Sequence, residues 1–166
     1  HCLVGSEMCI RDSYIVAKMT ESLISEEPLL EVPLENTLEI GTGCGYQTYL
    51  LSVFSKKVTT IERIDALHKR AQKLLKQLKI NNVDFKLGDG GELNDQKFDS
   101  ILSAAAPLEV PLNLKNKLKI GGRLILPVGN SNHQKLTLVK RLSKNEYSEE
   151  QIEDVLFVPL LKGVVS

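Results

Sequence analysis

The sequence has few of the features that build disulfide frameworks, zinc sites or membrane spans. It contains 3 cysteines, an odd number without a CxxC pair, which predicts neither disulfides nor zinc and favours a reducing, cytoplasmic compartment. Its apolar runs, such as Leu124 to Val128, are far shorter than the roughly 20 residues that a membrane span needs. Residues 1–11 include no hydrophobic segment of signal-peptide length, so we do not expect secretion.

An excess of charge of one sign is also absent. The 21 Lys and Arg residues balance 21 Asp and Glu residues, so no overall field would gather nucleic acid or anionic lipid, and we expect neither as a partner. Only 3 histidines occur, which gives little support to histidine-based catalysis. What is present, 166 residues with 42% hydrophobic side chains, is typical of one soluble domain with its own core.

Short runs rich in β-branched residues alternate with helix-like segments along the chain. This alternation predicts an α/β fold with a doubly wound, mostly parallel sheet. Helices are predicted at 14–25, 46–55 and 64–78. Strands are predicted at 37–40, 58–61, 83–87, 98–103 and 123–126, the last following a Gly121-Gly122 turn and stopping at Pro127. Segments 135–142 and 152–159 are predicted to form an antiparallel pair at the C-terminal edge of the sheet.

The most informative segment is a glycine-rich loop between a predicted strand and a predicted helix. It reads Leu38-Glu39-Ile40-Gly41-Thr42-Gly43-Cys44-Gly45-Tyr46-Gln47. Glycine has no Cβ and accepts a positive φ, so such a loop lets the backbone approach a ligand closely. The helix behind it offers N–H groups that lack a partner within the helix. The alternative interpretation is that the loop is only a tight connection.

Two acidic residues at later strand ends favour a ligand. Glu62 closes the second strand 21 positions after Gly41, the spacing at which nucleotide-binding α/β folds place a carboxylate on the ribose hydroxyls. Asp89 follows the third strand and would lie at the same end of the sheet, where an adenine amino group can donate to it, although an Asp between glycines is also a common turn former. Together these positions predict an adenosine-containing ligand.

The loop sequence narrows the choice of cofactor. A dinucleotide-binding GxGxxG loop would have glycine where Tyr46 stands, and the Gly-Lys-Ser/Thr of a P-loop is absent. Carboxylates at Glu62 and Asp89 would repel phosphates but are compatible with a sulfonium cofactor. Glu39, shortly before the first glycine, adds a third acid suited to a cationic ligand.

These residues resemble the class I S-adenosylmethionine-dependent methyltransferases, and among them the protein-L-isoaspartate O-methyltransferase family. The resemblance is carried by YIVAKMTE (14–21), LEIGTGCGYQT (38–48), IER (61–63), GDG (88–90), AAP (105–107), GGRLILPVG (121–129) and FVPLLKG (157–163). It implies a Rossmann-like methyltransferase fold and the cofactor S-adenosyl-L-methionine. It further implies a cytoplasmic repair enzyme that methylates the free carboxyl of L-isoaspartyl residues in damaged proteins, and we expect it to be a monomer.

The resemblance also implies roles for individual residues. The implied cofactor site consists of Glu39, Gly41, Gly43, Gly45, Glu62, Arg63, Asp89 and Gly90. The implied border of the peptide substrate is Val158, Pro159 and Leu160, for which ordinary packing of a last strand is the alternative. No metal and no catalytic side chain is assigned, because an α-carboxyl with a pKa of about 3.5–4 is already ionised at neutral pH and needs no general base.

The beginning of the chain departs from the family pattern. Residues 1–13 differ from the Gly-Gln-Thr-Ile-Ser-Gln-Pro-like segment that members carry before the run at Tyr14, and CLVGSEMCIRDS is typical of a translated sequencing adapter or assembly join. A divergent native start is the alternative. We therefore expect one methyltransferase domain at 14–166 that binds its cofactor but methylates isoaspartyl peptide poorly or not at all. The competing hypotheses are another class I methyltransferase, acting on a small molecule or nucleic acid, and a cofactor-binding remnant without turnover.

Overall fold

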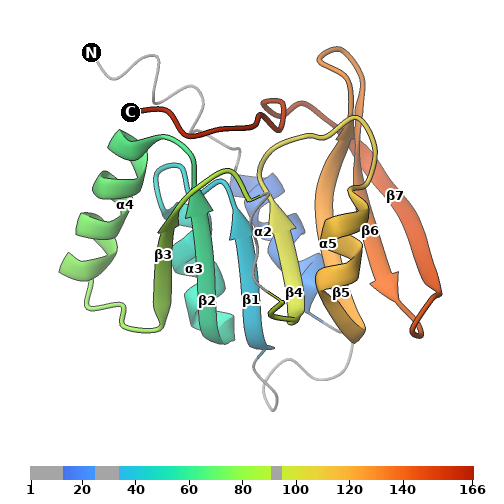
Figure 1. Ribbon diagram of the computed structural model, residues 1–166, viewed down its shortest axis with the longest axis horizontal. Helices are drawn as coiled ribbons and strands as arrows, with labels where there is room; N and C mark the ends of the chain where they lie inside the picture. Colours follow the sequence, from blue (N-terminus) through green and yellow to red (C-terminus); the bar gives the residue numbers. More distant parts are fainter. Residues whose placement is uncertain (1–12, 25–33, 91–94) are drawn as a thin grey trace.

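A seven-stranded sheet forms the centre of the computed structural model, which describes residues 13–24, 34–90 and 95–166 (Figure 1). The strands are β1 (Leu34–Ile40), β2 (Ser55–Glu62), β3 (Val83–Leu87), β4 (Phe98–Ser103), β5 (Leu118–Gly129), β6 (Gln134–Arg141) and β7 (Tyr147–Val155). The helices are α2 (Ser13–Leu23), α3 (Tyr46–Phe54), α4 (Asp65–Gln77) and α5 (Leu112–Lys117). Among the described residues, none of these helices has the length and apolar character needed to span a bilayer.

The sheet has the predicted mixed topology. Its strand order is β3-β2-β1-β4-β5-β6-β7, so the direction in which strands are added reverses between β1 and β4. Every pair from β3 to β5 is parallel, whereas β5–β6 and β6–β7 are antiparallel. The prediction of an α/β fold with a mostly parallel sheet and an antiparallel C-terminal edge is therefore confirmed.

Helices cover both faces of the sheet, each over its own apolar cluster. In Figure 1, α5 lies in front of the sheet, and α2 and α3 lie behind it. Leu114 of α5 joins a buried cluster with Ile101 of β4, whereas Leu102, the next residue, belongs to the cluster beneath α2 and α3. Successive side chains of a strand point to opposite faces, so β4 supplies both layers of the core.

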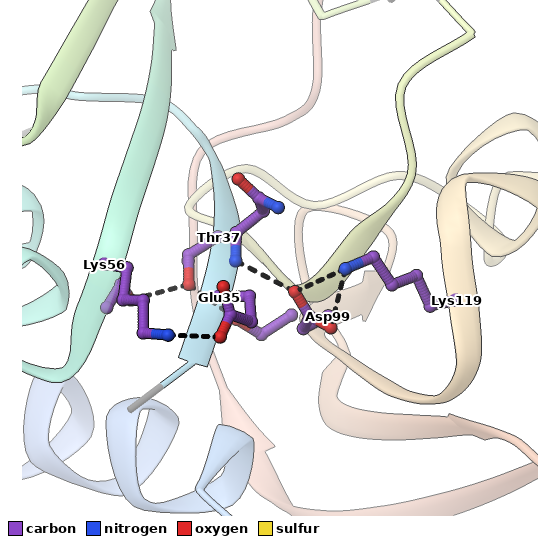
Figure 2. Close-up of polar contacts among 8 residues, drawn as sticks. Glu35, Thr37, Lys56, Asp99 and Lys119 are labelled. Carbon is purple, nitrogen blue, oxygen red and sulfur yellow. Dashed lines mark hydrogen bonds and ion pairs between the residues drawn. The ribbon is translucent and has the colours of Figure 1, made fainter. Parts of the chain in front are cut away.

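Hydroxyl groups and ion pairs fix the register of the central strands at their amino ends (Figure 2). The Thr37 hydroxyl on β1 is 2.7 Å from that of Ser55 on β2 and 2.7 Å from that of Ser100 on β4. The Asp99 carboxylate accepts hydrogen bonds from Lys119 Nζ at 3.0 Å. The three buried hydroxyls satisfy one another, as burial requires, whereas the Asp99–Lys119 pair is partly exposed.

The predicted end of β5 at Pro127 is wrong. The strand begins before the Gly121-Gly122 pair, continues through Pro127 and ends at Gly129. Pro127 pairs with Leu136 of β6 and lies beyond the last β4–β5 pair, Leu102 with Ile125. Since β6 alone among the described strands pairs with β5 at this point, the missing proline N–H removes at most one ladder hydrogen bond.

The predicted bounds of the last strand, 152–159, are also wrong. β7 includes the polar run from Ser148 to Gln151, which is exposed because β7 lies at the edge of the sheet. Lys135 of β6 donates to Asp154 of β7, and this hydrogen bond holds the pKa of the Asp154 carboxyl below its usual value. Charged side chains on such an edge discourage pairing with other chains.

The glycine loop connects β1 to α3 by residues in the left-handed region. Gly41, Gly43 and Gly45 have φ values of +93°, +55° and +85°. Gly45 is the N-cap of α3 and packs against α4, where an added Cβ would lie 2.7 Å from Leu75 Cδ1. The third glycine therefore permits close packing of α3 and α4.

We predict that Gly45→Ala lowers the free energy of unfolding by about 2–5 kcal/mol, since it combines left-handed backbone strain with overpacking. Gly121→Ala is the matched control, because Gly121 has a φ of +84° and an added Cβ there would meet no atom within 4 Å. This control should lose only the backbone contribution, about 1–2 kcal/mol. Urea unfolding of both variants measures the difference, and equal losses would contradict a packing role for Gly45.

Candidate functional site

A cavity opens at the carboxyl ends of the parallel strands, beside the point where the strand order reverses. Crevices of this kind are the usual ligand sites of open α/β sheets. Its walls come from the glycine loop, the ends of β2 and β3, the exit of β4 and the C-terminal segment. The lining residues include Gly41, Gly43, Glu62, Arg63, Asp89, Ala104, Val158, Pro159 and Leu160.

Glu62 joins the glycine loop to the end of β2. One carboxylate oxygen accepts a hydrogen bond from the Gly43 N–H at 2.9 Å, and the other accepts from the Ile64 N–H at 2.9 Å. The residue is buried, yet it lines the cavity. Each carboxylate oxygen has a further lone pair, so Glu62 can hold the loop and still accept from a ligand hydroxyl.

Asp89 and Arg63 lie together at the cavity rim, and both hold the C-terminal segment. Asp89 accepts from the Gly163 N–H at 2.7 Å, while Arg63 Nε donates to the Gly163 carbonyl at 2.9 Å. Gly90, with a φ of +77°, lies in an adjoining pocket and packs on Ile40, whose Cδ1 would be 3.3 Å from an added Cβ. Opposite charges thus clamp one residue of the C-terminal segment over the sheet.

The C-terminal segment crosses the carboxyl edge of the sheet after β7 (red in Figure 1). Pro159 forms a parallel bridge with Ala106, and Val165 forms one with Ile64. The predicted Val158-Pro159-Leu160 run therefore lies beside the exit of β4 and lines the cavity. Its continuation to Ile64 was not predicted, because no periodic pattern marks residues 160–166.

The structure places Glu39 beneath the glycine loop rather than in the cavity wall. The residue is completely buried, and its carboxylate accepts from the hydroxyls of Thr48 at 2.5 Å and Thr60 at 2.6 Å. Since the Thr60 proton goes to Glu39, Thr42 of the loop donates to Thr60 at 2.6 Å. Glu39 thus connects β1, β2, α3 and the loop. Neither Glu39 nor Gly45 lines the cavity.

The cavity combines a close approach of the glycine loop with charged groups on its lining. An added Cβ at Gly41 would lie 3.1 Å from the Ala104 Cβ, so a side chain there would fill the space between the loop and the exit of β4. Glu62 presents an acceptor for hydroxyl groups, and the lining also carries the Asp89 carboxylate and the Arg63 guanidinium. Of the N-terminal segment 1–13, which departs from the family pattern, residues 1–12 lie outside the described residues. Its last residue, Ser13, begins α2.

Sequence comparison relates most of the chain to one family. The sequence model of the protein-L-isoaspartate(D-aspartate) O-methyltransferase (PCMT) family matches residues 2–165. The chain is 43% identical to the protein-L-isoaspartate O-methyltransferase of Janthinobacterium sp. (strain Marseille) over 98% of its length, and spans 56% of that relative. It is also 43% identical to the protein of the same name from Shewanella amazonensis, covering 96% of this chain and 73% of that one. The chain thus spans little more than half of the first of these relatives.

Solved structures show the same fold. A Plasmodium falciparum protein described as a beta-aspartate methyltransferase (PCMT), crystallised with S-adenosyl-L-homocysteine, superimposes with a TM-score of 0.77 at 24% identity, covering 93% of this chain and 76% of that one. A structure described as protein-L-isoaspartate O-methyltransferase gives a TM-score of 0.73 at 25% identity, covering 87% of this chain and 46% of that one. The chain belongs to the protein-L-isoaspartate(D-aspartate) O-methyltransferase family.

Proposed function

We propose that this chain transfers a methyl group from S-adenosyl-L-methionine to the free carboxyl of L-isoaspartyl residues in damaged proteins. The observation that carries the proposal is the cavity between the glycine loop, which Glu62 holds, and two segments that we call the acceptor-side segments, 104–107 and 157–161. The chain that forms this cavity is 43% identical to a relative named protein-L-isoaspartate O-methyltransferase. We expect the enzyme to act as a monomer in the cytoplasm, where its cysteines meet a reducing environment.

In this proposal, different residues of the cavity bind different parts of the cofactor. Glu62 accepts hydrogen bonds from the ribose hydroxyls, and Asp89 accepts from the adenine amino group. Gly41 and Gly43 leave room for the methionine end along the loop. Glu39 acts from beneath, by holding the loop through Thr60 and Thr42. S-adenosylmethionine supplies an electrophilic methyl group on a sulfonium.

The remaining task of the chain is to position the acceptor. The isoaspartyl carboxylate is ionised at neutral pH, so no residue has to remove a proton from it. Ala106 and Pro159, joined in a parallel bridge, form a narrow wall beside the cavity. Aligning donor and acceptor and excluding water are the effects on which such a transfer depends.

The Glu62 assignment predicts a loss of cofactor affinity in Glu62→Ala. Hydrogen bonds to a charged group contribute about 1.5–3 kcal/mol, so the dissociation constant of S-adenosylhomocysteine should rise at least tenfold. Calorimetric titration measures it. Glu35→Ala, at the opposite end of β1, should bind as the parent chain does. Parental affinity in Glu62→Ala would contradict the ribose assignment.

Methyl transfer to an isoaspartyl peptide and to its aspartyl twin tests the reaction itself. The two peptides differ in which carboxyl is free and in the path of the backbone, and a misplacement of about 1 Å can cost a hundredfold in rate. We therefore expect kcat/KM for the isoaspartyl peptide to exceed that for the twin by at least about a hundredfold. Gly43→Val, which places a β-branched side chain on the loop, should abolish transfer to both. Equal rates with the two peptides would contradict the proposal.

A further inference from the structure

One cross-strand pair, Gly129 with Gln134, lies at the base of the β5–β6 hairpin and contacts both acceptor-side segments. Gly129 ends β5 and Gln134 begins β6, and the two are partners in the antiparallel register. The four residues between them form a turn in which Asn130 Oδ1 accepts from the His133 N–H at 2.9 Å. The pair is therefore a short, hydrogen-bonded support at the carboxyl end of the sheet.

The Gln134 side chain holds the C-terminal segment by its main chain. Its Nε2 donates to the Phe157 carbonyl at 3.0 Å, and its Oε1 accepts from the Phe157 N–H at 2.7 Å. The residue is 2% exposed, so these bonds form away from water. A side-chain amide that both donates to and accepts from the main chain of one residue makes the two hydrogen bonds that a neighbouring strand would make.

Gly129 holds the other segment. Its N–H donates to the Pro107 carbonyl at 2.9 Å, directly after the exit of β4. Its φ is +142°, and an added Cβ would lie 2.1 Å from the His133 carbonyl oxygen. Only glycine fits this position, and the close turn brings its N–H to Pro107.

The two held segments also bind each other. The Ala106 N–H donates to the Val158 carbonyl at 2.8 Å, and the Leu160 N–H donates to the Ala106 carbonyl at 2.9 Å. The two acceptor-side segments, 104–107 and 157–161, are thus hydrogen-bonded to each other, while Gly129 binds the first and Gln134 binds the second. The hydrogen bonds of Val158 and Leu160 face Ala106, so the N–H and carbonyl of Phe157 face the opposite side, where Gln134 lies.

We propose that Gln134 is a positioning residue for the methyl acceptor. It touches neither the cavity nor the cofactor residues, and it acts by fixing Phe157 and, through it, the neighbouring Val158-Pro159-Leu160 wall. The inference rests on the proposed function. A small displacement of this wall misaligns the acceptor carboxylate, which lowers the rate far more than it weakens ground-state cofactor binding.

Gln134→Leu tests the inference, because leucine is similar in size and removes both hydrogen bonds. We expect kcat/KM for the isoaspartyl peptide to fall at least tenfold, the dissociation constant of S-adenosylhomocysteine to rise less than threefold, and the Phe157 amide to exchange at least tenfold faster. Gln151→Leu on the exposed face of β7 is the matched control and should retain parental values in all three measurements.

The pH dependence of kcat/KM in Gln134→Glu provides a second test, because it would not change if Gln134 only stabilised the fold. A protonated glutamic acid can donate to the Phe157 carbonyl and accept from its N–H, whereas the carboxylate can only accept. The kcat/KM of this variant, relative to the parent at each pH, should rise as the pH falls from 8 to 6, because burial raises the pKa of a carboxyl.

Three results would overturn the inference. The first is a kcat/KM of Gln134→Leu within twofold of that of the Gln151→Leu control, and the second is a loss of cofactor affinity in Gln134→Leu as large as its loss of kcat/KM. The third is a relative kcat/KM of Gln134→Glu that does not change with pH. Absence of methyl transfer by the parent chain would instead refute the proposed function. Exchange of the Phe157 amide would then still decide whether Gln134 holds the segment.

Discussion

The reversal of strand order between β1 and β4 is the constraint on which the site depends. The chain leaves β1 toward α3 on one face of the sheet and leaves β4 toward α5 on the other, as the two apolar clusters show. The loops that follow the two strands therefore diverge and leave a crevice between them. The cavity lies at this point, and every segment that lines it either leaves a strand at its carboxyl end or crosses that edge.

Two buried carboxylates hold the glycine loop in this crevice. Burial of a charge is costly unless hydrogen bonds compensate for it. Glu62 accepts a backbone N–H at each of its two oxygens, and Glu39 accepts two threonine hydroxyls at one oxygen, Oε2. The loop is thus fixed from the cavity side and from beneath, so that its backbone is held in place before a ligand arrives. Such preorganisation lowers the entropic cost of binding.

Local patterns were sufficient for part of this account. The predicted bounds of β3 and β4 agree with the structure, because each is a short run closed by turn residues. The bounds of β5 and β7 were not predictable from local patterns. Pro127 is tolerated in β5 because it lies beyond the pairing with β4, and the polar run is tolerated in β7 because this strand lies at the edge of the sheet. The spacing of Glu62 predicted its place in the cavity. The contacts of Glu39 with Thr48 and Thr60, and of Gln134 with Phe157, depend on side chains that only the folded sheet brings together.

A crystal structure of the chain with S-adenosylhomocysteine tests the central claim most directly, namely that the cofactor binds where the strand order reverses. We expect the ribose hydroxyls within hydrogen-bond distance of the Glu62 carboxylate, the adenine beside Asp89, and the sulfur facing the wall formed by Ala106 and Pro159. A ligand bound at the amino ends of the strands, near Thr37, or in the cavity without contact to Glu62, would contradict the account.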